Sequence, residues 1–168
     1  MRIQLLETKT GKLLPAQIKK ATFKDMPLKK DGWNFNWRSL FRIERMEVYK
    51  VSLVDTPDIT EGVIAFSLQR NEMIELEDVE IAPYNIGRNG KYKRLTGALI
   101  AFCCLQSQTR GKGNYRGFVG FTSKTDLIAY YRKKYGASQA FGQRMFFSEE
   151  TGKILIKKYL ENEENKES

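Results

Sequence analysis

The 168-residue sequence predicts a single α+β domain built on a mixed, mostly antiparallel sheet. Three observations support this fold class. Three β-rich runs follow one another with only short turns between them, and a long helical stretch then separates the third run from another apolar run. Within the third run, the alternation of apolar and polar residues slips once. We expect one domain over residues 1–160 and a frayed tail over residues 161–168.

The first half of the chain reads as strands with one irregular insertion. The expected strands are residues 2–8, 48–55, 61–70 and 73–81. The last three are joined by short turns, one of them containing Pro57 and Asp58, and so predict an antiparallel meander. Residues 13–43 are expected to begin as a helix and to continue as a loop rich in aromatic side chains.

The second half alternates helices and strands. The expected helices are residues 95–111, 124–137 and 148–160, and the expected strands are residues 115–123 and 138–147. Gly136 is placed to end the second of these helices, and Ser148 to cap the third. The long first helix connects two strands, which we therefore expect to be parallel and adjacent.

The slip in alternation predicts a β-bulge. Ile74 and Leu76 share one face of the strand, whereas Val79 and Ile81 fall on the opposite phase. One extra residue near Glu77 and Asp78 would return all four to a single buried face. The alternative is a strand that ends at Leu76 and is followed by a loop.

Composition excludes several classes of chemistry and of location. The sequence contains no histidine, which removes an imidazole base and Ser/His or Cys/His nucleophile pairs. Its two cysteines are adjacent and have no histidine beside them, so no metal site is expected. There is no apolar run that could span a bilayer and no signal-peptide pattern at the start, which predicts a cytoplasmic protein without a membrane partner.

The net charge of +9 is distributed in blocks. Residues 51–87 contain one Lys or Arg and eight Asp or Glu, whereas residues 88–144 contain twelve and one. The boundary falls in a loop directly before the long helix. An acidic block beside a basic one predicts a site with two differently charged halves, where an anion and an amine could meet.

The order of these elements resembles the GCN5-related N-acetyltransferase superfamily. The resemblance covers a meander, a bulged strand, a basic loop, a helix, a parallel strand and a helix with the sequence YYRKKYGA. It implies that the central parallel pair is split by the bulge and that helices cover both faces of the sheet. It also implies an enzyme that transfers an acyl group, most plausibly acetyl, from acetyl-CoA or another acyl-CoA to an amine by direct attack.

The resemblance also suggests where the cofactor would bind. In the family, a Q/R-x-x-G-x-G/A motif at a helix start binds the pyrophosphate of coenzyme A. The matching positions here are Lys91, Tyr92, Lys93, Arg94, Leu95 and Thr96, followed by Gly97. Lys91 replaces Gln or Arg, Arg94 replaces the first glycine, and Thr96 replaces the last small residue. A helix N-terminus with added cations still suits a pyrophosphate.

Catalytic roles follow from the same resemblance. Backbone N–H groups of the bulged strand, near Val79 and Ile81, would polarise the acyl carbonyl. Tyr131 would donate a proton to the departing thiolate, with Tyr130 as the alternative in the same helix. Glu75 would be the base, although its polar-face position also suits a solvent-exposed strand residue.

An aromatic segment is the candidate acceptor-binding region. Trp33, Phe35 and Trp37 lie where the family binds its acceptor, and they equally suit packing of this segment against the sheet. Two other functions stay open. One is a non-catalytic module that binds acyl-CoA or a protein partner, and the other is a basic nucleic-acid-binding domain. The acidic run over residues 72–80 argues against a continuous phosphate-binding track.

Overall fold

The computed structural model describes residues 1–161, so the tail expected over residues 161–168 lies, except for Glu161, outside the described part of the chain. The strands are β1 (Arg2–Glu7), β2 (Leu13–Lys20), β3 (Glu47–Leu53), β4 (Gly62–Gln69), β5 (Met73–Ile81), β6 (Tyr92–Lys93), β7 (Val119–Thr122), β8 (Ser138–Phe141) and β9 (Arg144–Phe147). The α-helices are α1 (Trp37–Phe41), α2 (Leu95–Arg110), α3 (Ile128–Tyr135) and α4 (Glu149–Tyr159). Short 3₁₀ turns lie at Phe23–Asp25, Lys29–Asp31, Pro83–Asn85, Gly113–Tyr115 and Thr125–Leu127.

All nine strands form one sheet in the order β6-β1-β2-β3-β4-β5-β7-β9-β8. Strands β1 to β5 are sequential antiparallel neighbours, and β5 pairs with β7 in parallel after the crossover through α2. The α+β class, the mostly antiparallel sheet and the central parallel pair are therefore confirmed. None of the helices in residues 1–161 is both long and apolar enough to span a membrane.

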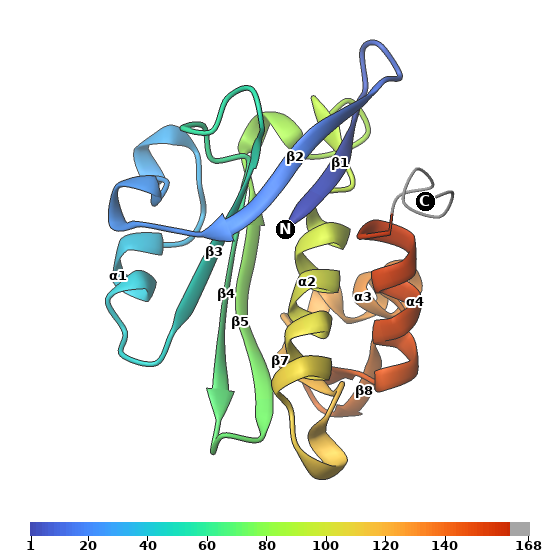
Figure 1. Cartoon of the computed structure of the whole chain (residues 1–168). Helices are drawn as coiled ribbons and strands as arrows, with labels where there is room; N and C mark the ends of the chain where they lie inside the picture. The colour runs from blue at the N-terminus through green and yellow to red at the C-terminus, as the bar shows by residue number, and fades with distance from the viewer. Residues whose placement is uncertain (162–168) are drawn as a thin grey trace.

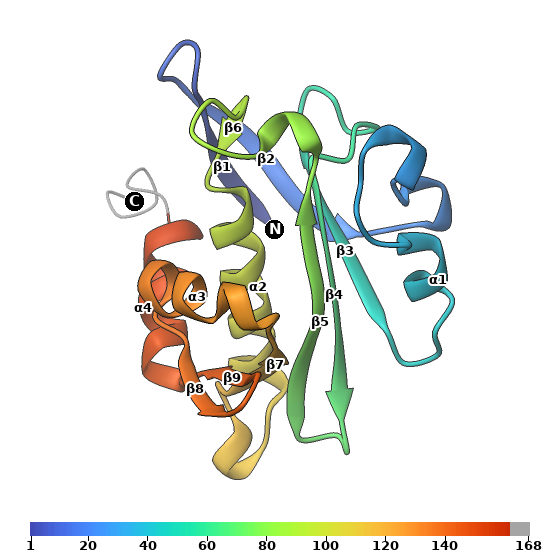
Figure 2. The same ribbon diagram turned by 180° about the vertical axis from the view of Figure 1, so that it is seen from behind.

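Helices lie on both faces of the sheet, as predicted. In Figures 1 and 2, α1 stands on one side of β3–β5, and α2 and α4 stand together on the other. The larger core fills the α2 side, where Leu99 and Phe102 pack against Ile64 and Phe66. A smaller core around Trp37 fills the α1 side.

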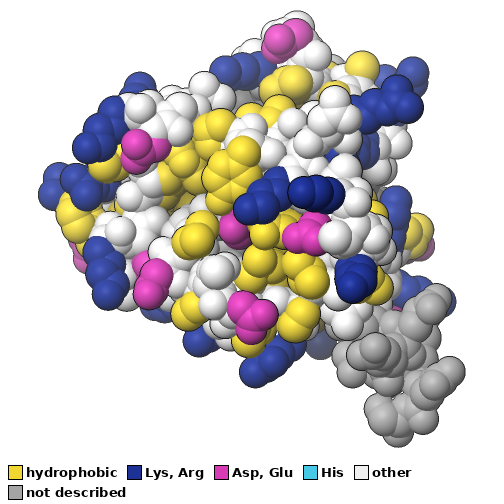
Figure 3. Space-filling view, turned by 90° about the horizontal axis from the view of Figure 1, so that it is seen from above, with side chains coloured by type: hydrophobic (Ala, Val, Ile, Leu, Met, Phe, Trp, Pro, Cys, Tyr) yellow, Lys and Arg dark blue, Asp and Glu magenta, His cyan; other side chains and the backbone are white. Residues whose placement is uncertain are grey.

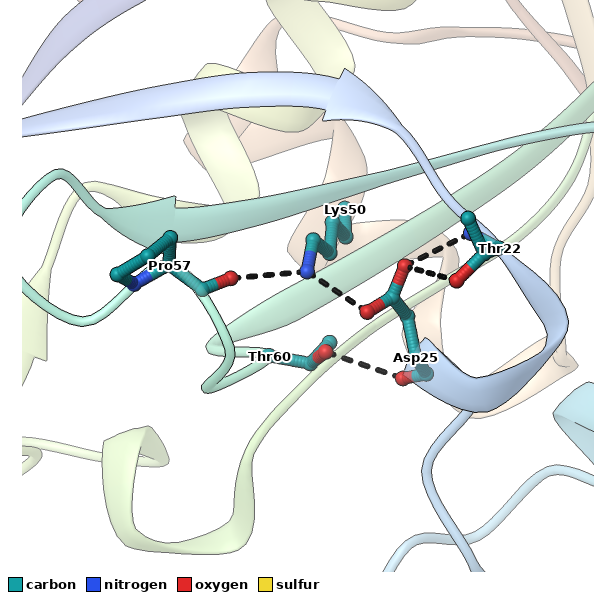
Figure 4. Close-up of polar contacts among 5 residues, drawn as sticks. All are labelled: Thr22, Asp25, Lys50, Pro57 and Thr60. Atoms are coloured by element: carbon teal, nitrogen blue, oxygen red, sulfur yellow. Dashed lines mark hydrogen bonds and ion pairs between the residues drawn. The ribbon is translucent and has the colours of Figure 1, made fainter.

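The segment that carries α1 is fixed to the sheet by a buried ion pair (Figure 4). The Lys50 ammonium on β3 donates to Asp25 Oδ1 over 2.8 Å and to the Pro57 carbonyl over 2.9 Å. Asp25 also accepts from the Thr22 amide and hydroxyl, and its own carbonyl accepts from the Thr60 hydroxyl. Burial alone would raise the pKa of Asp25, but the bonds from Lys50 and Thr22 lower it below its ordinary value. This network anchors the start of the covering segment.

The predicted β-bulge is confirmed in β5. Asp78 faces Ala65 of β4, and the next paired residue, Leu76, faces Phe66, so that Glu77 is unopposed. The bulge returns Val79 and Ile81 to the face of Ile74 and Leu76, against the larger core.

Two element predictions are wrong. Residues 13–20 do not begin a helix but form β2, because Ala16 and Ile18 are buried with period two between β1 and β3. The single strand expected over residues 138–147 is the hairpin β8–β9, which turns at Gly142 with φ of 54°.

Several other elements are confirmed with shorter bounds. The strand expected over residues 115–123 is β7, preceded by a 3₁₀ turn, and the helix expected over residues 124–137 is α3, which also follows a 3₁₀ turn. Gly136 ends α3 in the left-handed conformation, and the Ser148 hydroxyl caps α4 by accepting from the Thr151 amide.

Candidate active site

Strands β5 and β7 form a fork. Their parallel register contains two pairs, Ile74 with Val119 and Glu75 with Gly120, after which β5 passes its bulge and the strands separate. A cavity of about 420 Å³ opens between them, and we call it the fork cavity. Its walls are residues 76–81 of β5, Phe121 to Lys124 at the end of β7, Leu127, Tyr130 and Tyr131 beside and on α3, and Asn34, Phe35, Ile86 and Thr96.

Tyr131 reaches the fork cavity from α3. Its ring packs edge-to-face on Phe121 at 5.3 Å between centroids, and burial, with a smaller contribution from Tyr130 and Asp78, raises its pKa above the ordinary value. The phenol is therefore protonated at neutral pH and able to donate a proton. Tyr130, which is 43% exposed, lies at the rim.

Asp78 is the carboxylate in the fork whose pKa is displaced towards neutrality. Partial burial and the nearby charges of Glu77 and Glu80 raise its pKa to about 6, although Lys124 acts in the opposite direction. A carboxylate with a pKa near the working pH is suited to accept a proton. Sequence reasoning placed Asp78 at the bulge but assigned it no role.

Glu80, also on β5, holds the wall of the fork cavity in place. Its buried carboxylate accepts hydrogen bonds from the backbone amides of Asn34 and Phe35 over 2.6 and 3.2 Å. The Trp37 indole N–H donates to it over 2.8 Å. Because its carboxylate accepts from three donors, Glu80 fixes Asn34 and Phe35 beside β5.

The three aromatic residues predicted to bind the acceptor therefore separate. Phe35 lines the fork cavity, whereas Trp33 and Trp37 are buried in the smaller core and do not line it. For these two tryptophans the structure matches the packing alternative, because their rings fill the space between α1 and the sheet.

Glu75, the predicted base, lies elsewhere. Both Nη atoms of Arg144 donate hydrogen bonds to its carboxylate, Nη2 over 3.1 Å. Glu75 lines a different cavity of about 480 Å³, which Arg70 and Tyr115 also line. The structure does not bring Glu75 together with Tyr131. The reason is that Glu75 precedes the bulge, where β5 and β7 are still paired.

A third cavity, of about 630 Å³, lies at the N-terminus of α2, and we call it the basic cavity. Five cationic residues line it: Arg88, Lys93, Arg94, Lys134 and Lys158. No carboxylate lines it among the residues that the structure describes. Seen from above, this end of the molecule shows Lys and Arg side chains around hydrophobic ones, with Asp and Glu side chains among them near the centre (Figure 3).

The start of α2 directs backbone donors towards this cavity. Ala98 is the first residue whose amide bonds within the helix, to the Arg94 carbonyl, so the amides of residues 95–97 point out of the helix end. Arg94 makes no side-chain cap. Leu95, Thr96 and Gly97 all line the cavity, and a free helix N-terminus of this kind attracts anions.

Arg94, at the position of the first motif glycine, has a backbone conformation that is typical of glycine. It adopts the left-handed conformation with φ of 79°, which glycine reaches without strain. Its guanidinium donates to the Lys158 carbonyl at the end of α4 and lies over the Tyr159 ring at 5.4 Å. Arg94 thus joins the ends of two helices while it lines the cavity.

The predicted lysines differ in orientation. Lys93 lines the basic cavity and its ammonium donates to the carbonyls of Gly87 and Arg88, which closes the loop before α2. Lys91 does not line the basic cavity, and its ammonium lies over the rings of Tyr84 and Tyr92. Tyr92 lines the cavity beside Lys93.

The two cavities adjoin each other. Ile81, Ile86, Thr96 and Tyr130 line both of them. An elongated ligand with an anionic end could therefore place that end at α2 and its other end in the fork, beside Val79, Asp78 and Tyr131.

Cysteine is not an alternative nucleophile here. Cys103 and Cys104 are both buried in α2, and burial raises the pKa of Cys104 to about 12. A thiol with such a pKa is almost fully protonated at neutral pH.

Comparison with known proteins identifies this architecture. The sequence matches no protein-family model and no curated protein. Solved structures do match: the AtaT toxin bound to the C-terminus of the antitoxin AtaR has a TM-score of 0.61 at 14% identity, with 84% of this chain and 98% of that chain covered. AtaTR bound with acetyl-CoA gives 0.57 at 13%, with 84% and 98% covered, and the KacTA–DNA complex gives 0.57 at 12%, with 85% and 99% covered.

The chain has the GCN5-related N-acetyltransferase fold. At these identities the likeness establishes the fold, which agrees with the forked parallel pair and the bulged strand described above. Two cations of the basic cavity were not predicted from the sequence, because they lie on helices far along the chain from the basic loop. Lys134 and Lys158 stand on α3 and α4, and only the periodicity of these helices relative to the basic loop could have indicated them.

Proposed function

We propose that the protein is an acyl-CoA-dependent N-acyltransferase that transfers acetyl from acetyl-CoA to an amine. One observation carries the proposal: the fork cavity, which Asp78 and Tyr131 line, shares four lining residues with a cavity lined by five cations at a helix N-terminus. The fold agrees, and AtaTR, which shares it, is bound with acetyl-CoA. The acceptor amine would enter from the side of Phe35.

The residues present fit the cofactor. The pyrophosphate needs donors and positive charge, and the basic cavity offers the α2 amides together with cations that meet no carboxylate among the described lining residues. Arg94 takes the place of a glycine but keeps the backbone conformation that a glycine would provide. Ile86 and Tyr130, which line both cavities, would contact the pantetheine arm.

The chemistry divides between two side chains and one strand. Acetyl-CoA, when bound, supplies an activated thioester carbonyl. Asp78 accepts the proton that the amine nitrogen loses as the new C–N bond forms. Tyr131 donates its phenolic proton to the sulfur as the C–S bond breaks, and is reprotonated from water. After Glu75, β5 has no pairing register with β7, so amides near Val79 and Ile81 can face the carbonyl oxygen.

Titration calorimetry with acetyl-CoA tests the proposal. Lys134→Glu reverses a charge that lines the basic cavity, and Lys133→Glu makes the same change one residue earlier on α3, outside the cavity lining. Because both side chains are exposed, we expect Lys134→Glu to weaken binding roughly three- to tenfold and Lys133→Glu to change it less than about twofold. Equal effects of the two variants, or no binding by the wild-type protein at about 1 mM cofactor, would contradict the proposal.

A further inference from the structure

We propose that the basic cavity also binds the chain's own acidic segment, residues 162–168, which would then compete with anionic ligands. This goes beyond acyl transfer, because it requires only the cavity. Its effect on acetyl-CoA affinity rests in addition on the proposed function.

Within residues 1–161, no carboxylate compensates the positive charge of the cavity. The ion pairs within residues 1–161 involve Lys50, Arg110, Arg144 and Lys153, and none of these lines the cavity. Lys93 and Arg94 donate to backbone carbonyls only. Five like charges around one hollow repel one another, so an anionic occupant lowers the free energy of this arrangement.

The described chain leads directly to the cavity rim. Helix α4 ends at Tyr159, and both Lys158 and Tyr159 line the cavity. The Glu161 amide still bonds back to the Ile156 carbonyl over 3.2 Å, so the described chain ends two residues after Tyr159, which lines the cavity. Seven residues reach at most about 25 Å when extended, which is ample to enter it.

The segment has the complementary charge. Its sequence, NEENKES, contains Glu163, Glu164 and Glu167 against Lys166, a net charge of −2 from three negative charges and one positive. Its polar composition favours contact through charge over packing into an apolar site. The attachment to α4 makes the contact intramolecular, with an effective concentration on the order of millimolar.

The expected competition is modest. Exposed ion pairs each contribute little, so the segment should raise the apparent dissociation constant for acetyl-CoA about two- to fivefold at low salt. Because such pairs are screened, the effect should fade near 0.5 M salt or above, where the Debye length is only a few ångströms.

The experiment compares the full chain with two variants that change the charge of the segment in opposite directions. Glu163→Gln/Glu164→Gln/Glu167→Gln removes the acidic charges, and Lys166→Gln removes the one cation. Acetyl-CoA is titrated into each by calorimetry at about 0.02 M and about 0.5 M salt. In parallel, backbone amide NMR spectra without ligand follow the signals of Thr96, Gly97 and Lys134, with Lys153 as a basic position outside the cavity.

Tighter binding by the triple variant and weaker binding by Lys166→Gln, at low salt only, would support the proposal, as would shifts of the cavity amides but not of Lys153. If acetyl-CoA binds all three proteins equally and the cavity amides are unchanged, the segment does not occupy the cavity, and the proposed enzyme function is unaffected. If no protein binds acetyl-CoA but the cavity amides shift, the cofactor proposal fails and the docking proposal stands.

Discussion

Two side chains in the fork cavity respond to burial in ways that suit opposite tasks. Burial raises the pKa of Tyr131 and keeps its phenol protonated, and it raises the pKa of Asp78 to about 6, close to the pH at which a base must exchange its proton. They stand on different elements, α3 and the bulge of β5, and are brought together by the separation of the parallel strands. At the residue scale, the bulge therefore places Asp78, and not Glu75, in the fork cavity with Tyr131, which is why we propose Asp78 as the base.

Asp78 should make the stability of the protein depend on pH. Its folded pKa of about 6 exceeds the ordinary value of 3.8, so its favourable contribution is complete below pH 3.8 and is lost as the pH rises through about 6. Asp78→Asn should remove this loss and stabilise the protein at pH 7 by on the order of 1 kcal/mol, after allowance for partial exposure. Urea unfolding from pH 4 to pH 8 measures it.

The matched variant is Glu77→Gln, at the exposed bulge residue. Removing its charge should lower the pKa of Asp78 without abolishing the titration, which carbon NMR of the carboxyl group can follow. An Asp78 that titrates at its ordinary value in the wild-type protein would contradict both the assignment and the pH dependence.

Tyr131→Phe should separate binding from chemistry. The change removes one hydroxyl and leaves the packing on Phe121, so acetyl-CoA affinity should stay within about twofold. With an acceptor amine, turnover should fall on the order of 10²-fold, the scale expected when a positioned proton donor is lost. Tyr130→Phe, at the exposed rim, is the control and should change turnover little. Full turnover by Tyr131→Phe would assign the ring a packing role.

At the scale of elements, the contact between α2 and α4 shapes the basic cavity. Gly97 lies in the first turn of α2, and a Cβ there would stand 2.3 Å from ring atoms of Tyr159. The position that leaves no room for a side chain is therefore that of Gly97 and not that of Thr96. The motif pattern indicates that a small residue belongs near the helix start, but only packing against α4 shows which.

Gly97→Ala should therefore reverse the usual effect of this substitution. In an unconstrained helix it stabilises by roughly 0.5–1 kcal/mol, whereas overpacking against Tyr159 should destabilise by about 1–3 kcal/mol. In a Tyr159→Ala background the ring is absent and Gly97→Ala should be stabilising. Thermal or urea unfolding of the four proteins completes the cycle, and an additive result would show that the two residues do not interact.

Elements were predictable from the sequence where periodicity is unambiguous. The slip between Leu76 and Val79 locates the bulge, because a strand must keep one buried face. The prediction for residues 13–20 was wrong because Pro15 and a short apolar run suit a helix start as well as a strand. Only the pairing with β1 and β3 on both sides makes this segment a strand. The ion pair of Glu75 could not be predicted from the sequence, because its partner, Arg144, is 69 residues away.

At the scale of the molecule, we expect one cooperative unit over residues 1–160. The two tryptophans lie in the smaller core on the α1 side, whereas most of the helical signal comes from α2, α3 and α4 on the opposite face. If the sheet couples both faces, fluorescence and far-ultraviolet circular dichroism should report the same urea midpoint. Two separate transitions would mean that the segment holding α1 unfolds independently.

The order of strands along the chain sets what a ribosome exposes during synthesis. Strands β1 to β5 emerge in the order in which they pair, and residues 21–46, which cover one face, emerge among them. The opposite face, with Ile64 and Phe66, stays bare until α2 and finally α4 are made. A nascent chain that stops near residue 81 is therefore a sheet with one apolar face open to water. We expect such truncated chains to aggregate or to recruit chaperones, while the complete chain folds.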